Sequence, residues 1–519
     1  MKQKFPNIIL IVMDTVRADH LSSYGYYRNT SPNIDKIAEQ GVLFENAFST
    51  ATWSPPSHAS IFTGKYPSYH KTLGSNVYLE GDNTTLAKIL EANGYSTIGV
   101  TNCSLVGLGT GFERGFQTFV EPRTYTRFLP KELHRKASTV SMLLELLVHD
   151  PKEFVKTMVF GPDQYNTRTN EIIKGFIKSK QASKKPFFLF VNYFNCHAPY
   201  DPPRPFKERF CNDFSEPRLF IMEFVLERIL GKTLERIGNG NLDIMKLKYI
   251  TGASSEARFS YMAKELQISE KEWEIAQSWY DGEIAYLDHC IGELVDFVHN
   301  EGLFDNTVLV ITADHGENFG QHGLAGHHFR LYDSVLHVPL IMSCPSLIPK
   351  RKRLPEIVAT IDILPTVMSL CNLSVKDEIQ GKNLDPFEER KIHDFVCAEC
   401  GESVTEWALS FGLRGSRVRS GRQDSISSKV RSIDMGSKCI RNGEFKYILS
   451  ADGREELYDM LDDPTEENNI INERPDETRY LRRQLEKTLD ITYFGPKEIS
   501  YDEKERTEII DRLKALGYI

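Results

Sequence analysis

The chain of 519 residues lacks the marks of a membrane protein and of a nucleic-acid-binding protein. No apolar stretch approaches the roughly 20 residues that a membrane-spanning helix needs. A formal net charge of −9 argues against a general nucleic-acid binder, but it leaves a small anionic substrate open, because local fields decide such binding. The first residues lead directly into a strand-like run without a signal-peptide cleavage site, so we expect a cytoplasmic protein.

The sequence also lacks a disulfide framework, internal repeats and low-complexity segments. Its nine cysteines are scattered, and an odd number leaves at least one unpaired. Cys397 and Cys400 form a single CxxC with no second pair at zinc-ligand spacing, which favours two unconnected thiols over a zinc site. Hydrophobic residues make up 40% and charged residues 26%, as in ordinary globular proteins. The length predicts several cores, or one large core with insertions.

Two apolar runs end abruptly in acidic side chains. Thr307–Thr312 is followed closely by Asp314 and His315, and Asn7–Met13 is followed by Asp14. Continuous apolar runs of this length are typical of buried strands, and ligands bind at the carboxyl ends of strands in open α/β sheets. Carboxylate oxygens beside an imidazole nitrogen suit a divalent cation. Each acidic residue taken alone could equally be a helix cap.

Histidines follow two of the predicted strands. The strand-like run Pro186–Phe194 precedes His197, and three more histidines follow the strand that ends at Asp314. These are His322, His327 and His328. Three histidines within seven residues are unusual for a bare loop, although any one of them could be a hydrogen-bonded structural residue.

A serine followed by two prolines predicts the start of a helix at Ser54. A hydroxyl at a helix amino terminus meets free N–H groups and the positive end of the helix dipole. That environment lowers the pKa of the hydroxyl and favours an anionic ligand. An ordinary serine cap would satisfy the same pattern.

These segments together resemble the sulfatase family of the alkaline phosphatase superfamily, along nearly the whole chain. The matching segments, in the family's order, are Asn7–Asp14, Ser54–Gly64 with Lys65–Pro67, Tyr280–Ile284, Asp314–Glu317, Val338–Ile341, and Glu456–Asp459 followed by Asp463 and Pro464. The resemblance implies an α/β fold with a large mixed, mostly parallel central sheet flanked by helices. It also implies a small C-terminal subdomain with an antiparallel sheet and a terminal helix. We place the catalytic domain at 1–385, with insertions at about 121–165 and 205–270, and the subdomain at 386–519.

The resemblance further implies roles for individual residues. Ser54 falls on the family nucleophile, a Cys or Ser that is oxidised to formylglycine. One divalent cation, Ca²⁺ or Mg²⁺ with Mn²⁺ also compatible, would be bound by Asp14, Thr15, Ser54, Asp314 and His315. The remaining catalytic candidates are His58, His197, His327 and His328, of which His327 or His328 falls where the family places a Lys against the sulfate. Substrate contacts are expected from Lys65, Asn102, His197 and His322.

The chain departs from the family pattern at three of these positions. The paired Asp-Asp appears as Asp14-Thr15, and the usual Gly-Lys appears as Thr101-Asn102. His58 stands where the nucleophile motif has Arg. Two fixed positive charges that would clamp a sulfate are therefore missing. Formylglycine at Ser54 is also in doubt, because the signal for that oxidation normally includes the Arg.

The departures leave three functions open. The prediction is a metal-dependent hydrolase of small anionic sulfate esters, with no nucleic-acid or membrane partner, using Ser54 or its formylglycine derivative. An unmodified serine would form a sulfo-serine that has no second hydroxyl to expel sulfate. A phospho-serine can be hydrolysed by in-line water, so the alternative is a phosphodiester, phosphomonoester or phosphonate hydrolase. The third reading is an inactive family member that only binds an anion.

Overall fold

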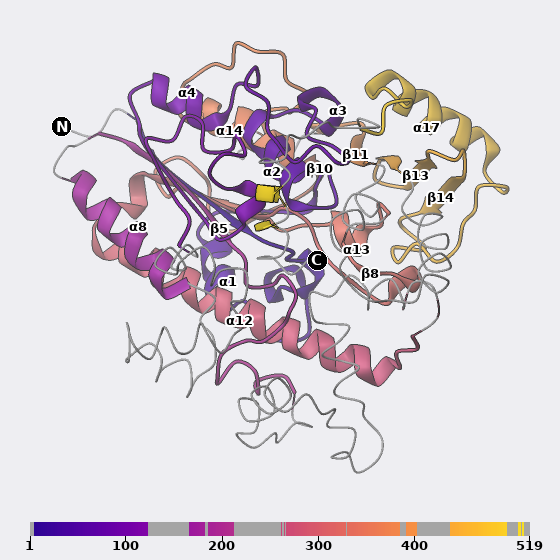
Figure 1. Cartoon of the computed structure of the whole chain (residues 1–519), viewed down its shortest axis with the longest axis horizontal. Coiled ribbons are helices and arrows are strands. Elements are labelled where there is room, and N and C mark those ends of the chain that lie inside the picture. The colour runs from indigo at the N-terminus through magenta and orange to yellow at the C-terminus, as the bar shows by residue number, and fades with distance from the viewer. Residues whose placement is uncertain are drawn as a thin grey trace.

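The computed structural model describes residues 5–122, 166–181, 185–211, 261, 264, 266–327, 330–384, 391–401, 436–495, 507–509 and 511–512. Most of both expected insertions, and His328, lie outside these described residues. Figure 1 shows a large sheet enclosed by helices, with a smaller sheet and a helix near the C-terminal end of the chain. Among the helices of the described ranges, none is long and apolar enough to cross a membrane.

The central sheet has eight strands in the order β10-β2-β9-β6-β1-β5-β3-β4. Their bounds are β1 Asn7–Met13, β2 Val42–Phe48, β3 Ser96–Thr101, β4 Thr118–Val120, β5 Phe187–Tyr193, β6 Thr307–Ala313, β9 Leu340–Ser343 and β10 Lys352–Ala359. All pairings are parallel except those of β9, which runs antiparallel to β2 and β6. The prediction of a mixed, mostly parallel sheet is therefore confirmed.

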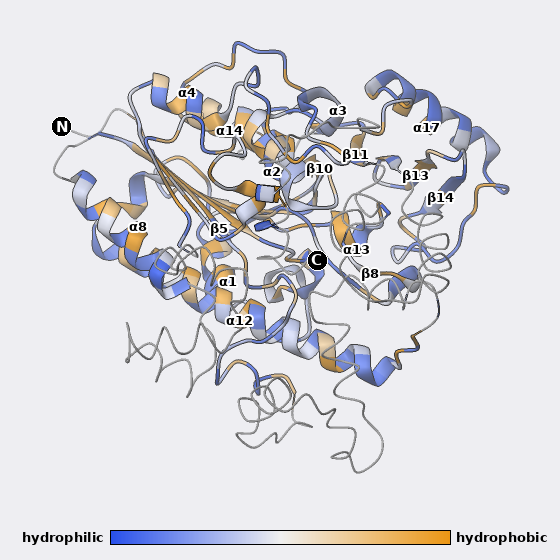
Figure 2. Cartoon of the chain, viewed as in Figure 1, coloured by the Kyte–Doolittle hydropathy of each residue, from blue (hydrophilic) through white to orange (hydrophobic). Residues whose placement is uncertain are grey.

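Helices cover both faces of this sheet because alternate residues of its central strands face opposite cores. Ile8, Leu10 and Val12 of β1 pack with α2 Ser54–Thr63, α4 Leu86–Ala92 and α14 Ile363–Leu370. Ile9, Ile11 and Met13 pack with α1 Pro32–Glu39, α8 Asn166–Gln181 and α12 Glu270–Asn300. Figure 2 shows the apolar strands between these helices. A capping box of Ser269 and Glu272 begins α12, whose apolar positions recur at intervals of three and four.

The C-terminal part contains the expected antiparallel sheet. Its strands are β11 Val396–Cys400, β12 Ser437–Arg441, β13 Phe445–Ser450 and β14 Glu455–Asp459, in that order, with α17 Pro475–Thr488 packed against them. A bridge between Ala51 and Glu399 joins this sheet to the segment that precedes α2. The domain boundary at 385 stays a prediction.

Candidate active site

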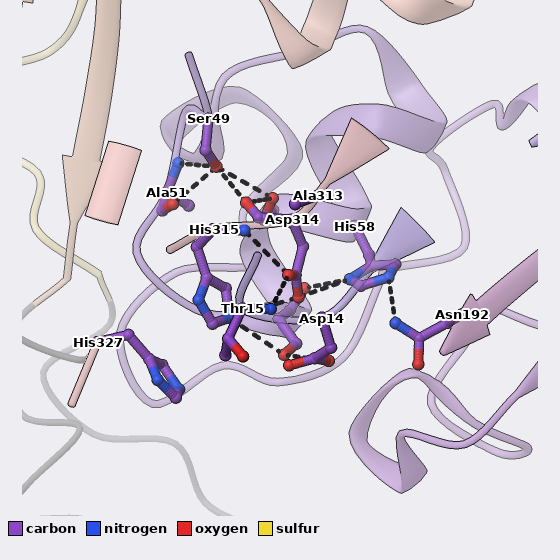
Figure 3. Close-up of polar contacts among 12 residues, drawn as sticks. Asp14, Thr15, Ser49, Ala51, His58, Asn192, Ala313, Asp314, His315 and His327 are labelled. Atoms are coloured by element: carbon purple, nitrogen blue, oxygen red, sulfur yellow. Dashed lines mark hydrogen bonds and ion pairs between the residues drawn. The ribbon is translucent and has the colours of Figure 1, made fainter. Parts of the chain in front are cut away.

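Two neighbouring strands bring the predicted acidic residues together. β1 and β6 are parallel, and their register pairs Met13 with Ala313, so the residues that follow each strand emerge side by side. Asp14, Asp314 and His315 each offer one ligand atom, and these atoms lie within 4.8 Å of one another. All three side chains are fully buried, and they meet at the centre of Figure 3.

Hydrogen bonds from neighbouring segments hold Asp314 in place. Its Oδ1 accepts from the backbone N–H of Thr15 at 3.1 Å and of His315 at 2.9 Å. Its carbonyl oxygen accepts from the hydroxyls of Ser49 at 2.5 Å and Ser57 at 2.6 Å. The carboxylate is thus oriented before any ligand binds, with Oδ2 directed away from the backbone donors.

The donor set fits a hard divalent cation. Asp14 Oδ1 and Asp314 Oδ2 are buried and accept no hydrogen bond from the described residues. Burial raises the pKa of Asp14 well above its usual range, and the nearby Asp314 carboxylate raises that pKa further. A bound cation would offset both effects, because it supplies positive charge to two desolvated carboxylates.

Ser54 lies beside this group. It is the first residue of α2, and Pro55 and Pro56 occupy the first turn, where their missing N–H groups cost nothing. Its Oγ lies 3.4 Å from Oδ2 of Asp14 and 3.5 Å from Nε2 of His315. A hydroxyl at a helix amino terminus, against a candidate cation site, is placed to act as a nucleophile.

His58 lies one turn further along α2, and its two hydrogen bonds suit a neutral imidazole. Its Nδ1 donates to the Ser54 carbonyl oxygen at 2.9 Å, and its Nε2 accepts from Nδ2 of Asn192 at 3.3 Å. Burial between Phe62 and Phe190 lowers the pKa of His58, although the Asp314 carboxylate opposes that shift. His58 therefore joins α2 to β5 and supplies no fixed positive charge.

Two further histidines lie next to the acidic group. The His327 ring lies 4.3 Å from the His315 ring at an interplanar angle of 29°, and 5.2 Å from the His197 ring at 70°. The His197 ring stacks on Phe194 at 4.4 Å, and its Nδ1 donates to the Ala198 carbonyl at 2.7 Å. The predicted residues Asp14, Ser54, His58, His197, Asp314, His315 and His327 therefore occupy one buried region.

A family model for sulfatases matches residues 6–373. The chain belongs to the sulfatase family. The arylsulfatase of Clostridium perfringens is 25% identical in an alignment 523 residues long, which covers 93% of this chain and 94% of that relative. The N-acetylglucosamine-6-O-sulfatase of Bacteroides thetaiotaomicron is 24% identical, over 97% of this chain and 88% of that relative.

Solved structures share the fold. A protein solved with its substrate D-glucosamine-2-N,6-O-disulfate superimposes with a TM-score of 0.66 at 21% identity, over 95% of this chain and 100% of that chain. The phosphonate monoester hydrolase of Agrobacterium radiobacter gives a TM-score of 0.65 at 21% identity, over 93% of this chain and 95% of that chain. This sulfatase-family hydrolase thus has structural neighbours that differ in chemistry.

The structure places several expected site residues of this sulfatase-family chain elsewhere. Lys65 follows the far end of α2, about 15 Å from Ser54 along the helix axis, and its Nζ contacts Asn83 at 3.4 Å. His322 stacks on Tyr332 at 3.7 Å. Neither residue contributes to the proposal below.

Two other expected residues lie at the sheet edge, and each donates a side-chain hydrogen bond to a neighbouring segment. Thr15 has a φ of 58°, its hydroxyl donates to the Cys196 carbonyl, and its amide rather than its hydroxyl contacts Asp314. Asn102 donates to Thr169 at 3.2 Å. A Thr15 hydroxyl that is already engaged is a poor substitute for the second carboxylate of the sulfatase motif.

Sequence reasoning assigned no role to four residues that support the site. Ser49 and Ser57 fix the Asp314 carbonyl, and Glu317 contacts His327. Asn192, which contacts His58, is the penultimate residue of β5, so its place at a strand end could have marked it. Ser57 falls on the serine of the family's nucleophile motif, whereas Ser49 carried no signal, because a hydroxyl that bonds a distant carbonyl leaves no pattern in the sequence.

Proposed function

We propose that this sulfatase-family chain is a divalent-cation-dependent hydrolase of small sulfate esters, with the Ser54 oxygen or its formylglycine derivative as the nucleophile. The observation that supports this most directly is the position of Ser54 Oγ, within 3.5 Å of both Asp14 and His315. The arylsulfatase and the N-acetylglucosamine-6-O-sulfatase among the relatives support sulfate esters as the substrate class.

Asp14, Asp314 and His315 would hold the cation, which would supply positive charge against the ester's anionic oxygens. Asp14 Oδ2 accepts the hydrogen bond of Ser54 and so orients the hydroxyl oxygen toward the ester. A bond would form between Ser54 Oγ and sulfur while the bond between sulfur and the ester oxygen breaks, and the hydroxyl proton of Ser54 would pass to Oδ2 of Asp14. The departing alcohol oxygen takes a proton from an imidazole, for which His197 and His327 are the candidates.

A second candidate is hydrolysis of a phosphodiester, phosphomonoester or phosphonate ester by unmodified Ser54. The neutral state of His58 favours it, because the position that carries Arg in the family motif gives no cation here. The fold of a phosphonate monoester hydrolase is also compatible with the whole chain. Water can hydrolyse a phospho-serine, whereas a sulfo-serine requires a second hydroxyl on the same carbon.

Two measurements separate these functions. The mass of the tryptic peptide 37–65 shows whether Ser54 has lost two hydrogens, or carries the hydrate of the aldehyde. Turnover of an aryl sulfate, an aryl phosphonate monoester and a bis-aryl phosphate is measured with Ca²⁺, Mg²⁺ and Mn²⁺. We expect a modified peptide together with aryl sulfate turnover. An unmodified peptide with phosphorus ester turnover would replace the proposal by the second candidate. No turnover with tight anion binding would leave the inactive family member.

A further inference from the structure

The segment Tyr280–Ile284 of α12 matches the family pattern but has no role in the proposed chemistry. Its first two residues, Tyr280 and Asp281, are fully buried although both carry polar groups. Both side chains contact the segment that follows β1, which begins with Asp14. The contacts of these two residues therefore bear on the position of the first carboxylate of the candidate cation site.

The Tyr280 hydroxyl joins two backbone groups of the turn after β1. It donates to the Thr15 carbonyl oxygen at 2.6 Å and accepts from the Arg17 N–H at 2.9 Å. A phenolic hydroxyl both donates and accepts, so a single oxygen serves both groups. Phenylalanine would fill the same space but would leave these two backbone groups of buried residues without this partner.

Aromatic neighbours fix the direction in which that hydroxyl points. The centre of the Tyr280 ring lies 5.1 Å from that of His20, 5.6 Å from that of Tyr200 and 5.0 Å from that of Phe319. At the next position of the helix, Oδ1 of Asp281 contacts Nδ1 of His20 at 2.7 Å. Two adjacent residues of α12 thus fix the helix relative to the segment after β1.

The turn that Tyr280 contacts has a conformation that threonine disfavours. Thr15 has a φ of 58°, in the left-handed region, where a β-branched residue is an outlier. Such a conformation persists only where the surrounding contacts impose it. Here it directs the Thr15 N–H to Oδ1 of Asp314 at 3.1 Å. Figure 3 shows Thr15 beside both Asp14 and Asp314, so this turn connects the two carboxylates of the candidate cation site.

We propose that Tyr280 is a positioning residue for the cation site: its hydroxyl holds Thr15 in the left-handed conformation in which Asp14 and Asp314 converge on one ion. This inference rests on the cation site of the proposed function and is independent of which ester is cleaved. Tyr280 acts on the site through the backbone alone. Without the hydroxyl the turn relaxes toward an ordinary φ, and only the fraction of molecules that keeps the left-handed turn binds the ion at full affinity.

Isothermal titration calorimetry of the whole chain with Ca²⁺, Mg²⁺ and Mn²⁺, after chelation, tests the proposal. We expect Tyr280→Phe to raise the Kd of the cation about 5- to 30-fold, the factor that corresponds to one residue in the left-handed conformation. Tyr193→Phe is the matched control and should leave the Kd unchanged. Tyr193 is equally buried in the same core, and its hydroxyl donates to Oδ1 of Asn170 on α8. An unchanged Kd in Tyr280→Phe, or an equal rise in Tyr193→Phe, would overturn the proposal.

Glycine at position 15 separates an effect on the turn from a general loss of packing. Glycine adopts positive φ about as readily as negative φ, so a Thr15→Gly turn keeps the required conformation in about half of the molecules without support from Tyr280. In the Thr15→Gly background, Tyr280→Phe should therefore raise the Kd only about twofold. The lost bond from the Thr15 hydroxyl to the Cys196 carbonyl is common to both members of that comparison. An equal rise in both backgrounds would refute the proposed route through the turn.

Amide hydrogen exchange provides a readout without a cation. The Arg17 N–H donates to the Tyr280 hydroxyl, so its exchange in the chelated protein should be about 10-fold faster or more in Tyr280→Phe, while the amides of β6 stay unchanged. Unchanged exchange at Arg17 would refute the inference. An unaltered chain that binds none of the three cations would overturn the inference together with the cation site. Cation binding that depends on Tyr280, without turnover of any ester, would count against the proposed function alone.

Discussion

Replacing Asp314 by Asn should affect stability in opposite directions with and without a cation. In the unaltered chain, ligand atoms of Asp14 and Asp314 lie within 4.8 Å of each other in a buried site. At a pH above the raised pKa of Asp14, two like charges at that separation repel by about 3 kcal/mol at an effective dielectric constant of 20. Asp314→Asn removes this repulsion, because the amide can turn its Nδ2 toward Asp14 while its oxygen still accepts from the backbone.

This gain in stability is partly offset by weaker hydrogen bonds to the side chain at position 314. Oδ1 of Asp314 accepts from the N–H groups of Thr15 and His315, and each bond to a neutral acceptor contributes about 1 kcal/mol less than one to a carboxylate. The net effect is a cation-free Asp314→Asn protein about 1 kcal/mol more stable than the unaltered chain. With a cation at 100 times its Kd the unaltered chain gains about 2.7 kcal/mol, and the variant should gain almost nothing.

Thermal unfolding at one scan rate, after chelation and after addition of Ca²⁺, Mg²⁺ or Mn²⁺, measures both effects. The two proteins should change order, with the variant more stable without the cation and less stable with it. Asp452→Asn is the matched control, because Asp452 lies far along the chain in an exposed ion pair with Arg454; it should keep the cation response. An Asp314→Asn protein stabilised by the cation as strongly as the unaltered chain would refute the assignment of this group.

Three further outcomes are expected. Ser54→Ala should abolish turnover of every ester while the thermal response to the cation persists, because Asp14, Asp314 and His315 remain. Burial lowers the pKa of His70 to about 3. The stability that depends on the neutral ring is therefore fully present above pH 6.5. About 2 kcal/mol of the free energy of unfolding is lost as pH falls from 6.5 to 5, because the unfolded chain then binds a proton at His70. Thermal unfolding of His70→Gln should show a flatter decline over that range. Lys446→Met leaves the buried Asp333 and Glu466 without their shared ammonium partner and should cost about 3–5 kcal/mol in denaturant unfolding.

The strands that could be predicted from the sequence are those whose side chains are apolar on both faces and need no particular partner residue to be buried. β1 and β6 lie within the sheet between parallel neighbours, so both faces are apolar and the sequence shows a continuous run. β10, Lys352–Ala359, was missed because it lies at the sheet edge, contains a proline and includes exposed and half-buried residues among its buried ones. β12 was missed because one of its buried side chains is Lys438, which is buried only because Glu399 pairs with it.

The candidate cation site was predictable for a geometric reason. Neighbouring parallel strands end at the same edge, so acidic residues directly after β1 and β6 had to meet if those strands were adjacent. The ends of helix α2 were also marked, by Pro55 and Pro56 at the start and Gly64 after the last turn. The family resemblance then placed Ser54 opposite the acidic pair.

The roles of the histidines could not be predicted, because residue type does not determine protonation or partner. His58 was a catalytic candidate at the position of the family's arginine, but its ring contacts a carbonyl on one side and an amide on the other, which suits a neutral imidazole. His327 was one of several candidates until a hairpin placed it against Glu317. Both outcomes depend on contacts between residues that only the folded chain brings together.

These contacts bear on how an anionic ester would be stabilised. If His58 is neutral, helix α2 contributes its amino-terminal N–H groups but no charged side chain at the position of the family's arginine. Positive charge near Ser54 would then come chiefly from the ion held by Asp14 and Asp314. Anion binding should then depend on the cation more strongly than in a relative that keeps the arginine.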